Sequence, residues 1–588
     1  MDTMTYTPTE DLSFNFDGAA EHFQCEMTCL PQEIEGITSI RIQFTAEQPT
    51  TPTTSTISWR EPMDQIHFKW NPLCYEHRFL DISSGCQNSI TTKSNYGAPV
   101  TCLHTISGEN TITFALSDAL HESTVGFRVN EDGTATCNVK LFCEPWSPIQ
   151  IYSTILRIDR RPLSYHRCLR ECAEWWDGLI PTEAISIPEG ARTARYCSWY
   201  PFHGKFTGED IERQCVLAKE LGIGTFGYEA GWAETAPGND NLDHEPDPDK
   251  YTDFRKHIDK IHSYGMKFVL WDAPSFTTPG TAERFKDKLL GNKFGENGNL
   301  DPRYPDVRED IISTYVRIVR DYDVDGLFLD FMPFFGTAQA AEPEDADRDL
   351  KSVAAAVDRL LHDLIVQLKQ LNPDILMEFR QPYIGPHMRK YANMFRAVDC
   401  GNCFADNRIR TLDIRMLCGA AIAHADPIMW NTCEPVESAA MQLTHTLFSV
   451  PQVSMDLETL PADHTEMIRT YISFWNEHRD VILDGELNPI EPQSAYPLVL
   501  SSTQDKLLAA LYSTAVIPTP HDLPATVLIV NGTYGDHVVV EAAGAFGKRR
   551  LTVISCTGVK VCDKEIELGA GLHRIDVPPN GYATLQAE

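Results

Sequence analysis

The chain has 588 residues and a formal net charge of −33, from 50 Lys and Arg against 83 Asp and Glu. A surface this acidic repels phosphate backbones and anionic lipid headgroups, which excludes nucleic acids and membrane surfaces as partners. Hydrophobic residues make up 42% of the chain, enough for a sizeable core, so a disordered protein is excluded as well. These properties leave a folded protein whose substrate is neutral or tolerates acidic walls.

The amino-terminal segment MDTMTYTPTEDLSFNFDG has neither the basic end nor the apolar stretch of a secretory signal. No apolar run in the chain approaches the roughly 20 residues that a membrane span needs. The 17 cysteines are odd in number and irregularly spaced, so we expect reduced thiols in a cytoplasmic protein. The pairs Cys168/Cys172 and Cys400/Cys403 lack the second close pair that would complete a zinc site, so no metal is predicted.

Residues 1–160 predict a domain that resembles a β-sandwich. Apolar residues alternate with polar ones from Ile40 to Phe44, as in a strand with one buried face. Segments 127–129 and 137–142 flank a Glu-Asp-Gly turn and predict a β-hairpin.

Residues 194–485 follow a helical linking segment at 161–193 and alternate short apolar strands with longer amphipathic helices. The helices have recognisable ends, such as the capping box Thr207-Gly-Glu-Asp210 and the stop at Gly222. Eight βα units in about 290 residues predict a (β/α)8 TIM barrel. The predicted strands are 195–199, 223–228, 267–271, 326–331, 375–379, 394–397, 427–430 and 452–455.

Residues 486–588 return to short β-branched runs separated by Gly and Pro, and predict an antiparallel β-sandwich. Typical runs are 527–530 and 551–554. We therefore expect a multidomain chain, with a central TIM barrel between two β domains.

The reactive groups of a TIM barrel lie at the carboxyl ends of its strands. Here those ends collect carboxylates and tryptophans without a histidine cluster, since His424 and Asp426 are only a pair. Indole rings stack on the apolar faces of pyranoses, and carboxyl groups bind hydroxyls or transfer protons, so the rim predicts a sugar site. Its residues are Trp199, Glu229, Trp232, Trp271, Asp272, Asp330, Glu378, Arg380, Asp399, Trp430 and Asp456.

Five segments along the predicted barrel occur in a familiar order and spacing. They are residues 197–232, which end in GYEAGW, then GMKFVLWDAP (265–274), residues 299–333, which end in GLFLDFMP, ILMEFRQP (375–382) and MFRAVDCGN (394–402). These segments resemble the clan of retaining α-galactosidases, glycoside hydrolase families 36 and 27, with the family 31 α-glucosidases as cousins. The likeness extends over about residues 160–480; the flanking β domains add only architecture.

The resemblance implies a retaining exo-α-glycosidase, most similar to α-galactosidases, which hydrolyses terminal α-linked sugars of oligosaccharides or glycosides through a glycosyl-enzyme intermediate. It implies no cofactor, and the family often forms homo-oligomers through its β domains. The nucleophile would be Asp330, which ends the strand Gly326-Leu-Phe-Leu-Asp330, unless it only caps the next turn. The general acid/base would be Asp399, a role that calls for a carboxyl buried beside Asp330. Asp406, seven residues later, is the alternative.

The resemblance and the strand positions also assign side chains to substrate binding. Glu229 matches the first acid of the family's Asp-Asp-Gly-Trp turn, which holds sugar hydroxyls. Glu378 and Arg380 would form a pair that steers the nucleophile or a hydroxyl, or else a structural ion pair. For the tryptophans, packing at the barrel end is the alternative. The set comprises Trp199, Glu229, Trp232, Trp271, Asp272, Phe328, Glu378, Arg380, Asp406 and Trp430.

Departures from the family pattern bear on the identity of the sugar. Phe328-Leu-Asp330 stands where family 36 has Lys-Trp-Asp, and Ala230 replaces the second acid of the Asp-Asp-Gly-Trp turn. The lost lysine puts galactose in doubt and leaves open a sugar whose anion meets Arg380. The rival enzyme is a family 31-like α-glucosidase, and the rival outside enzymes is a catalytically inactive carbohydrate-binding barrel.

Overall fold

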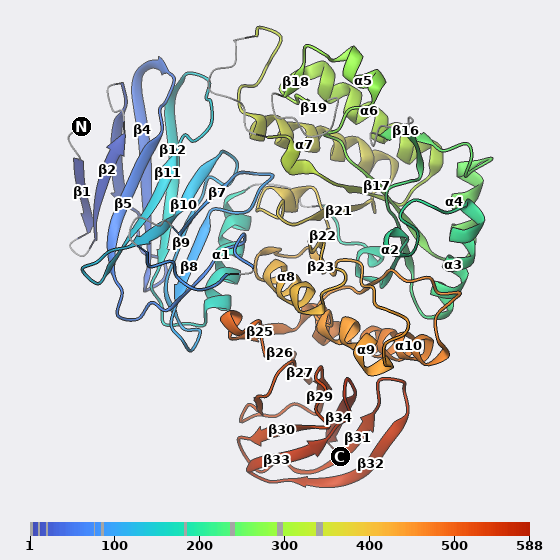
Figure 1. Cartoon of the computed structure of the whole chain (residues 1–588). Coiled ribbons are helices and arrows are strands. Elements are labelled where there is room, and N and C mark those ends of the chain that lie inside the picture. The colour runs from blue at the N-terminus through green and yellow to red at the C-terminus, as the bar shows by residue number, and fades with distance from the viewer. Residues whose placement is uncertain are drawn as a thin grey trace.

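The computed structural model describes the chain except residues 1–3, 10–11, 19–21, 76, 84–87, 181–184, 236–241, 291–297, 337–344 and 588. Two β domains, blue and red in Figure 1, flank a central barrel, and this is the fold class that the sequence predicts. None of the helices in the described ranges combines the length and the apolarity that crossing a membrane requires.

The amino-terminal domain consists of two six-stranded antiparallel sheets. Buried and accessible side chains alternate along their strands, as in β5, where Trp59 is buried and Arg60 is exposed. Trp59 packs edge-on against Phe114 of the other sheet, with ring centroids 5.1 Å apart. The predicted hairpin is β10 with β11. One sheet is ordered β1 (Met4–Thr9), β2 (Leu12–Gly18), β5 (Ser55–Pro62), β11 (Thr134–Leu141), β10 (Ser123–Val129), β7 (Asn88–Thr92), and the other β3 (Gln24–Cys29), β4 (Ile37–Thr50), β12 (Ile149–Asp159), β9 (Asn110–Leu116), β8 (Val100–His104), β6 (Phe68–Trp70).

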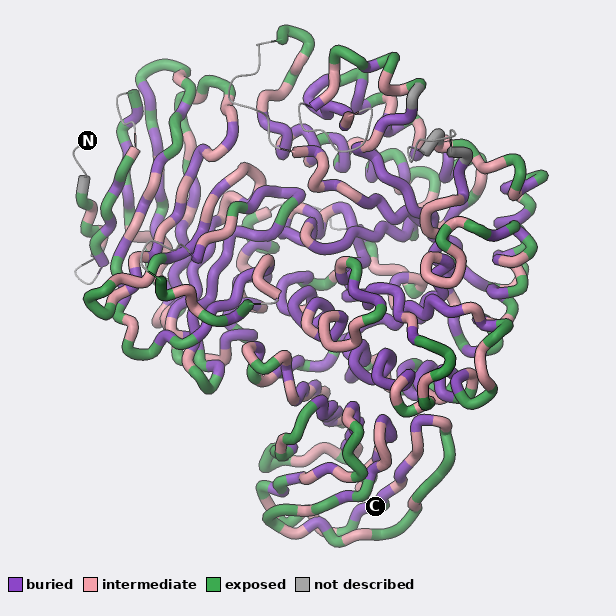
Figure 2. The backbone as a smooth tube through the Cα atoms, viewed as in Figure 1, coloured by how far each residue is buried: buried purple, intermediate pink, exposed green. Residues whose placement is uncertain are grey.

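Eight parallel strands form the central barrel, and nearly all of their residues are buried (Figure 2). The first strand, β13, pairs with both β14 and β24, and bridges from His424 to Val450 and from Ile428 to Val453 nearly close the ring. The predicted TIM barrel is thus confirmed. Its strands are β13 (Arg195–Cys197), β14 (Thr225–Tyr228), β17 (Lys267–Asp272), β20 (Gly326–Leu329), β21 (Leu376–Arg380), β22 (Met394–Arg396), β23 (Ile422–His424) and β24 (Gln452–Val453).

The helices around the barrel begin and end where sequence signals predict. Thr207 caps α3, because its Oγ1 accepts a hydrogen bond from Asp210 N at 3.3 Å while Asp210 Oδ2 accepts one from Thr207 N at 2.8 Å. Gly222 follows this helix with φ 86°, a conformation that favours glycine. The helices are α1 (Tyr165–Leu179), α2 (Trp199–Phe202), α3 (Gly208–Glu220), α4 (Phe254–Ser263), α5 (Pro279–Arg284), α6 (Pro305–Tyr322), α7 (Val353–Leu371), α8 (Phe404–Leu417), α9 (Val436–His445) and α10 (Ala462–Glu477).

Shorter elements complete the barrel domain and the passage to the carboxyl-terminal domain. Two small hairpins, β15 with β16 and β18 with β19, lie within the connections of the barrel. They are β15 (Ala233–Thr235), β16 (Leu242–Pro246), β18 (Leu289–Leu290) and β19 (Asn299–Leu300), and the short helical turns are η1 (Glu189–Arg192), η2 (Met332–Phe334), η3 (Met388–Lys390), η4 (Asp480–Asp484) and η5 (Pro492–Ser494).

The seventh barrel strand differs from the prediction. It is β23 and not residues 427–430. The apolar run at 427–430 forms a connection that touches the barrel through Ile428, whose N donates to Gln452 O at 2.7 Å. Proline at position 427 offers no N–H to a central strand, although the run is more apolar than the Ile-Ala-His that forms β23. Asp426, and not Trp430, is therefore the side chain just beyond the end of strand seven.

The carboxyl-terminal domain is a β-sandwich of a seven-stranded and a three-stranded sheet. Most neighbouring strands are antiparallel as predicted, but β27 with β29 and β28 with β30 run parallel. Leu551 of the larger sheet and Val540 of the smaller one belong to the same buried core. The larger sheet is ordered β25 (Glu486–Ile490), β26 (Leu498–Ser502), β27 (Lys506–Leu511), β29 (Thr526–Asn531), β34 (Tyr582–Ala587), β31 (Gly547–Ile554), β32 (Lys560–Leu568), and the smaller β28 (Val516–Pro518), β30 (His537–Ala542), β33 (Gly571–Asp576).

A buried carboxylate joins the three parts of the chain. Asp413 of α8 accepts hydrogen bonds from Trp70 Nε1 at 3.2 Å and from Tyr496 OH at 2.6 Å, and it forms an ion pair with Arg78. Trp70 and Arg78 belong to the amino-terminal domain, whereas Tyr496 lies just before β26 of the carboxyl-terminal domain. If either β domain moved away, the buried carboxylate of Asp413 would lose a partner that compensates its charge, which is costly. This contact therefore holds both β domains against the barrel.

A second contact connects the amino-terminal domain with the end of the barrel at which its strands have their carboxyl termini. It is made by residues 93–97, here called the 93–97 turn, whose Asn95 is fully buried. Asn95 Nδ2 donates to Met332 O at 2.8 Å, in the segment after β20. Gly97 N donates to Pro382 O at 2.7 Å, in the segment after β21. The amino-terminal domain therefore supports the loops that follow strands four and five.

Acid should destabilise the protein, because buried histidines are held neutral in its fold. His424 Nε2 donates to Ala191 O at 2.9 Å, and burial, together with Arg195, lowers the pKa of His424 to about 3. Burial lowers the pKa of His104 to about 4. The unfolded chain takes up these protons near pH 6.5 and the folded chain does not, so the free energy of unfolding falls as the pH drops from about 6.5 toward 4.

Between about pH 6.5 and pH 4, protonation of each of these histidines in the unfolded chain should lower the free energy of unfolding by about 1.4 kcal/mol per pH unit. Urea unfolding of the wild type and of His424→Gln between pH 7.5 and pH 5 measures this effect. The variant should lose stability on acidification less steeply than the wild type. Equal slopes would show that His424 is not held neutral by the fold.

Candidate active site

A cavity of about 300 Å³ lies at the carboxyl ends of the barrel strands. Its wall combines carboxylates and arginines with aromatic rings. The lining residues are Trp199, Tyr200, Glu229, Ala230, Trp271, Phe276, Asp330, Phe331, Arg380, Arg396, Asp399, Asp426 and Pro427. Six of the residues that the sequence predicts for the site are among them: Trp199, Glu229, Trp271, Asp330, Arg380 and Asp399.

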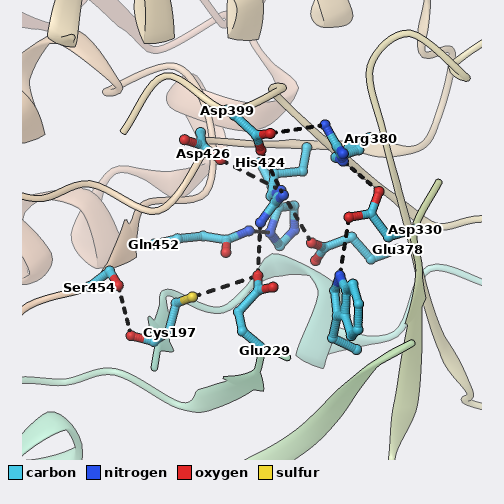
Figure 3. A network of polar contacts seen from close by, with 12 residues as sticks. Cys197, Glu229, Asp330, Glu378, Arg380, Asp399, His424, Asp426, Gln452 and Ser454 are labelled. Carbon is cyan, nitrogen blue, oxygen red and sulfur yellow. Dashed lines mark hydrogen bonds and ion pairs between the residues drawn. The ribbon is translucent and has the colours of Figure 1, made fainter. Parts of the chain in front are cut away.

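Asp330, directly after β20, is held by donors from neighbouring segments. Its Oδ1 accepts hydrogen bonds from Arg380 Nε at 2.5 Å (Figure 3) and from Tyr383 OH at 3.0 Å. Its Oδ2 accepts one from Trp271 Nε1 at 3.1 Å. The next residue, Phe331, has φ 55°, an uncommon conformation for an aromatic residue, and its N donates to Asp330 Oδ1 at 2.6 Å. The carboxylate is therefore buried and oriented by donors that are already in place.

Asp399, three residues after β22, faces Asp330 across Arg380 (Figure 3). Its Oδ2 lies 3.5 Å from Arg380 Nη1, while Arg380 Nε binds Asp330. Because one planar guanidinium reaches both carboxylates, their nearest oxygens lie within about 8 Å of each other. The burial expected for Asp399 is not found, since its side chain is 71% exposed at the cavity wall. Asp406, the alternative acid/base, is half-buried in the first turn of α8 and does not line the cavity.

Arg396, at the end of β22, is a cation of the cavity that the sequence analysis does not single out. Its guanidinium lies over the ring of Phe328 at 4.5 Å, and its Nη1 donates to Glu229 Oε1 at 2.9 Å. Its Nη2 lies 3.7 Å from Asp399 Oδ1. Burial alone would lower the pKa of Arg396, but Glu229, Asp426 and Asp399 together raise it above its ordinary value. Burial raises the pKa of Glu229, although Arg396 opposes this shift.

Several residues predicted to bind the substrate lie outside the cavity wall. Asp272 is fully buried, with Oδ2 2.6 Å from His244 Nδ1, and its backbone O accepts a hydrogen bond from Asp330 N at 2.7 Å. Trp232 is also fully buried, and its Nε1 donates to Trp271 O at 2.9 Å. Both residues thus support the strands that carry the cavity, and Trp232 has the packing role that the sequence leaves open.

The predicted pair of Glu378 with Arg380 is not formed. The two residues share one face of β21 but lie at successive levels along it. Glu378 forms a buried ion pair with Arg195, while Arg380 binds Asp330. Phe328 lies beneath Arg396 and is almost fully buried. Trp430 lies outside the cavity wall as well, because strand seven ends earlier than predicted.

Comparisons with known proteins find solved structures that have the same fold. No protein-family model and no curated protein matches the sequence. The α-galactosidase from Lactobacillus brevis has a TM-score of 0.63 at 13% identity, over 100% of this chain and 87% of that one. A variant of a family 36 α-galactosidase from Geobacillus stearothermophilus, in complex with stachyose, has a TM-score of 0.65 at 14% identity, over 100% and 84%.

A family 31 sulfoquinovosidase from E. rectale, in complex with an aza-sugar inhibitor, has a TM-score of 0.61 at 11% identity, over 100% of this chain and 89% of that one. Structures from families 36 and 31 thus share the fold, and these are two branches of the clan that the sequence resembles. At such identities the likeness shows the fold alone, and the chemistry has to be argued from the cavity.

Proposed function

We propose that the protein is a retaining exo-α-glycosidase, most similar to α-galactosidases, which removes one neutral terminal sugar. The observation that carries this proposal is that Asp330 and Asp399, after strands four and six, meet at one cavity with Arg380 between them. The cavity volume of about 300 Å³ is at the lower end for ligand pockets, which favours a single sugar ring and an exo-acting enzyme.

In the first proposed step, Asp330 attacks the anomeric carbon while Asp399 gives its proton to the departing glycosidic oxygen. The aglycone leaves as an alcohol, and an ester joins the sugar to Asp330. Asp330 Oδ2 is the attacking oxygen, because it accepts only the hydrogen bond from Trp271 Nε1 among the described residues, whereas Oδ1 accepts three, from Arg380, Tyr383 and the N of residue 331. In the second step, Asp399 takes a proton from water, whose oxygen attacks the anomeric carbon and breaks the ester. The sugar is released with its α configuration retained.

The charges of the cavity favour a neutral sugar over an anionic one. Arg380 is bonded to Asp330 and Arg396 to Glu229, so each guanidinium already holds a carboxylate. Among the described lining residues, four carboxylates face two arginines. A sulfonate or carboxylate on the sugar would have to separate a buried ion pair, which is costly. This arrangement argues against the sugar anion that the sequence leaves open at Arg380.

The position of Arg396 supports an α-galactosidase-like preference. In the family pattern a lysine stands where this chain has Phe328, and that cation binds ring hydroxyls. Here the guanidinium of Arg396 lies over the ring of Phe328 and belongs to the cavity wall. A cation is therefore available close to the position at which the lysine is lost.

A panel of 4-nitrophenyl α-glycosides tests the proposal. We expect the α-galactoside to be hydrolysed faster than the α-glucoside, and both faster than the anionic α-sulfoquinovoside. NMR of the first-formed product should show the α-anomer before mutarotation. A faster α-glucoside would favour the family 31-like enzyme, and a β-anomer as first product would overturn the retaining mechanism. Sugar binding without turnover of any glycoside would favour the inactive carbohydrate-binding barrel.

A further inference from the structure

Asp426 is a carboxyl of the cavity that the proposed reaction does not use. It lies two residues after β23 and lines the cavity together with Asp330 and Asp399, although it is only 1% exposed. In the view of Figure 3 it lies on the side of the site away from Asp330. A carboxyl this deeply buried calls for an explanation, because transfer of the group out of water is costly unless partners compensate it.

The backbone of Asp426 is held by a single side chain. Asn407, fully buried in α8, accepts a hydrogen bond from Asp426 N at 3.0 Å and donates one to Asp426 O at 3.0 Å. Cys400 N donates to Oδ2 of Asp426 at 2.7 Å, and Tyr200 OH lies 3.4 Å from the same oxygen. The carboxyl group is therefore fixed in one orientation before any ligand arrives, as in preorganised binding sites.

The second carboxyl oxygen, Oδ1, has no hydrogen bond from any residue in the described ranges. The nearest cationic atom is Arg396 Nε at 3.8 Å, which is beyond hydrogen-bond distance. Burial raises the pKa of Asp426 to about 6; Arg396 and the N of Cys400 lower it, whereas Asp399 and Glu229 raise it further. A fixed carboxyl with one oxygen left over at a cavity wall is suited to a polar group of a ligand.

We propose that Asp426 is a sugar-binding residue, whose Oδ1 forms a hydrogen bond with a ring hydroxyl of the sugar held between Asp330 and Asp399. The inference rests on the proposed function and adds to it a contact at the end of strand seven. A hydroxyl can both donate and accept, so the bond forms whether Asp426 is ionised or protonated.

The test uses the aryl α-glycoside that the panel shows to be hydrolysed fastest, and its free monosaccharide. Asp426→Ala should raise KM and the inhibition constant of the monosaccharide by about 10- to 100-fold, the range for a lost hydrogen bond to a charged group. Asp426→Asn should lose less, because its amide oxygen can keep the bond from Cys400 N while its NH₂ faces the sugar hydroxyl.

Asp325→Ala is the matched control. Asp325 precedes β20, accepts a hydrogen bond from Lys267 Nζ at 2.7 Å, and does not line the cavity, so KM should stay unchanged. A merely structural role of Asp426 would lower the melting temperature of Asp426→Ala and leave KM and the inhibition constant as in the wild type. That result would overturn the inference, and so would a loss that grows as the leaving group becomes poorer, which indicates a proton donor.

A calorimetric comparison separates the proposed glycosidase function from the proposed sugar contact of Asp426. It measures how tightly the monosaccharide binds to Asp330→Asn and to Asp330→Asn/Asp426→Ala. Weaker binding to the double variant supports the contact even where hydrolysis fails. Equal binding, in a protein that does hydrolyse α-glycosides, removes the role of Asp426 and leaves the proposed function standing. A wild type that neither binds nor hydrolyses any sugar of the panel overturns both.

Discussion

Replacement of Asp330 by asparagine should lower kcat by at least about four orders of magnitude, as expected when a catalytic nucleophile is removed. The amide is nearly isosteric and its oxygen can still accept the hydrogen bonds of Arg380 Nε and Tyr383 OH, so the shape of the cavity is preserved. An amide nitrogen cannot attack the anomeric carbon. Steady-state kinetics should therefore show a lost kcat, while monosaccharide binding stays within a fewfold of the wild type.

A matched control is available at the other end of the same strand. Asp325 precedes β20 and bonds His262 Nε2 at 2.8 Å and Lys267 Nζ at 2.7 Å, far from the cavity lining. Asp325→Asn should change stability and leave kcat within about threefold. Residual activity of Asp330→Asn above one part in a hundred, in a preparation free of deamidated protein, would contradict the role of Asp330 as nucleophile.

Replacement of Asp399 by asparagine should slow substrates with poor leaving groups by about 10²- to 10⁴-fold, the usual contribution of a general acid. A natural oligosaccharide needs protonation of its departing oxygen, whereas an aryl glycoside with an acidic phenol does not. The loss should therefore shrink as the phenol becomes more acidic. Since the side chain of Asp399 is 71% exposed, the substitution should barely change stability, and kcat/KM across a series of leaving groups measures its chemistry directly.

Asp406→Asn is the comparison for this series. Its side chain is half-buried outside the cavity, so its substitution should give no dependence on the leaving group. If Asp406→Asn shows that dependence and Asp399→Asn does not, the acid/base role belongs to Asp406.

The barrel could be predicted because its signals are local. The capping box at Thr207 and the glycine at 222 mark a helix within a few residues, and βα alternation repeats along 290 or so positions. Strand seven could not be placed, because the apolar run at 427–430 has a stronger strand pattern than Ile422–His424. That choice depends on which segment can complete a barrel of parallel strands, and this is decided by distant parts of the chain.

Contacts between distant parts of the chain also limit how much of the candidate site can be predicted from the sequence. Asp330, Asp399 and Arg380 could be predicted from their places at strand ends and from the family pattern. Arg396 could not be predicted, because its position at the cavity depends on the contact of its guanidinium with the ring of Phe328, which is 68 positions earlier in the sequence. An arginine within one residue of the end of a predicted strand, at Arg396 as at Arg380, is the signal that could have identified it. Asp426 is not predicted to bind a sugar, because the strand predicted at 427–430 places Asp426 before strand seven and not beyond its end.

The 93–97 turn contacts both loops that carry residues of the candidate site, so it bears on the order in which that site forms. During synthesis, domains generally fold in order from the amino terminus. We therefore expect the turn, which donates hydrogen bonds to Met332 O and Pro382 O, to be folded before the ribosome has made the segments that carry Asp330 and Tyr383. Gly385 also packs closely against the 93–97 turn, since a Cβ at position 385 would lie 2.5 Å from Gly97 O. We therefore expect the first domain to serve as an intramolecular template for the loops that follow strands four and five, and a barrel expressed without it would lack the surface that they contact.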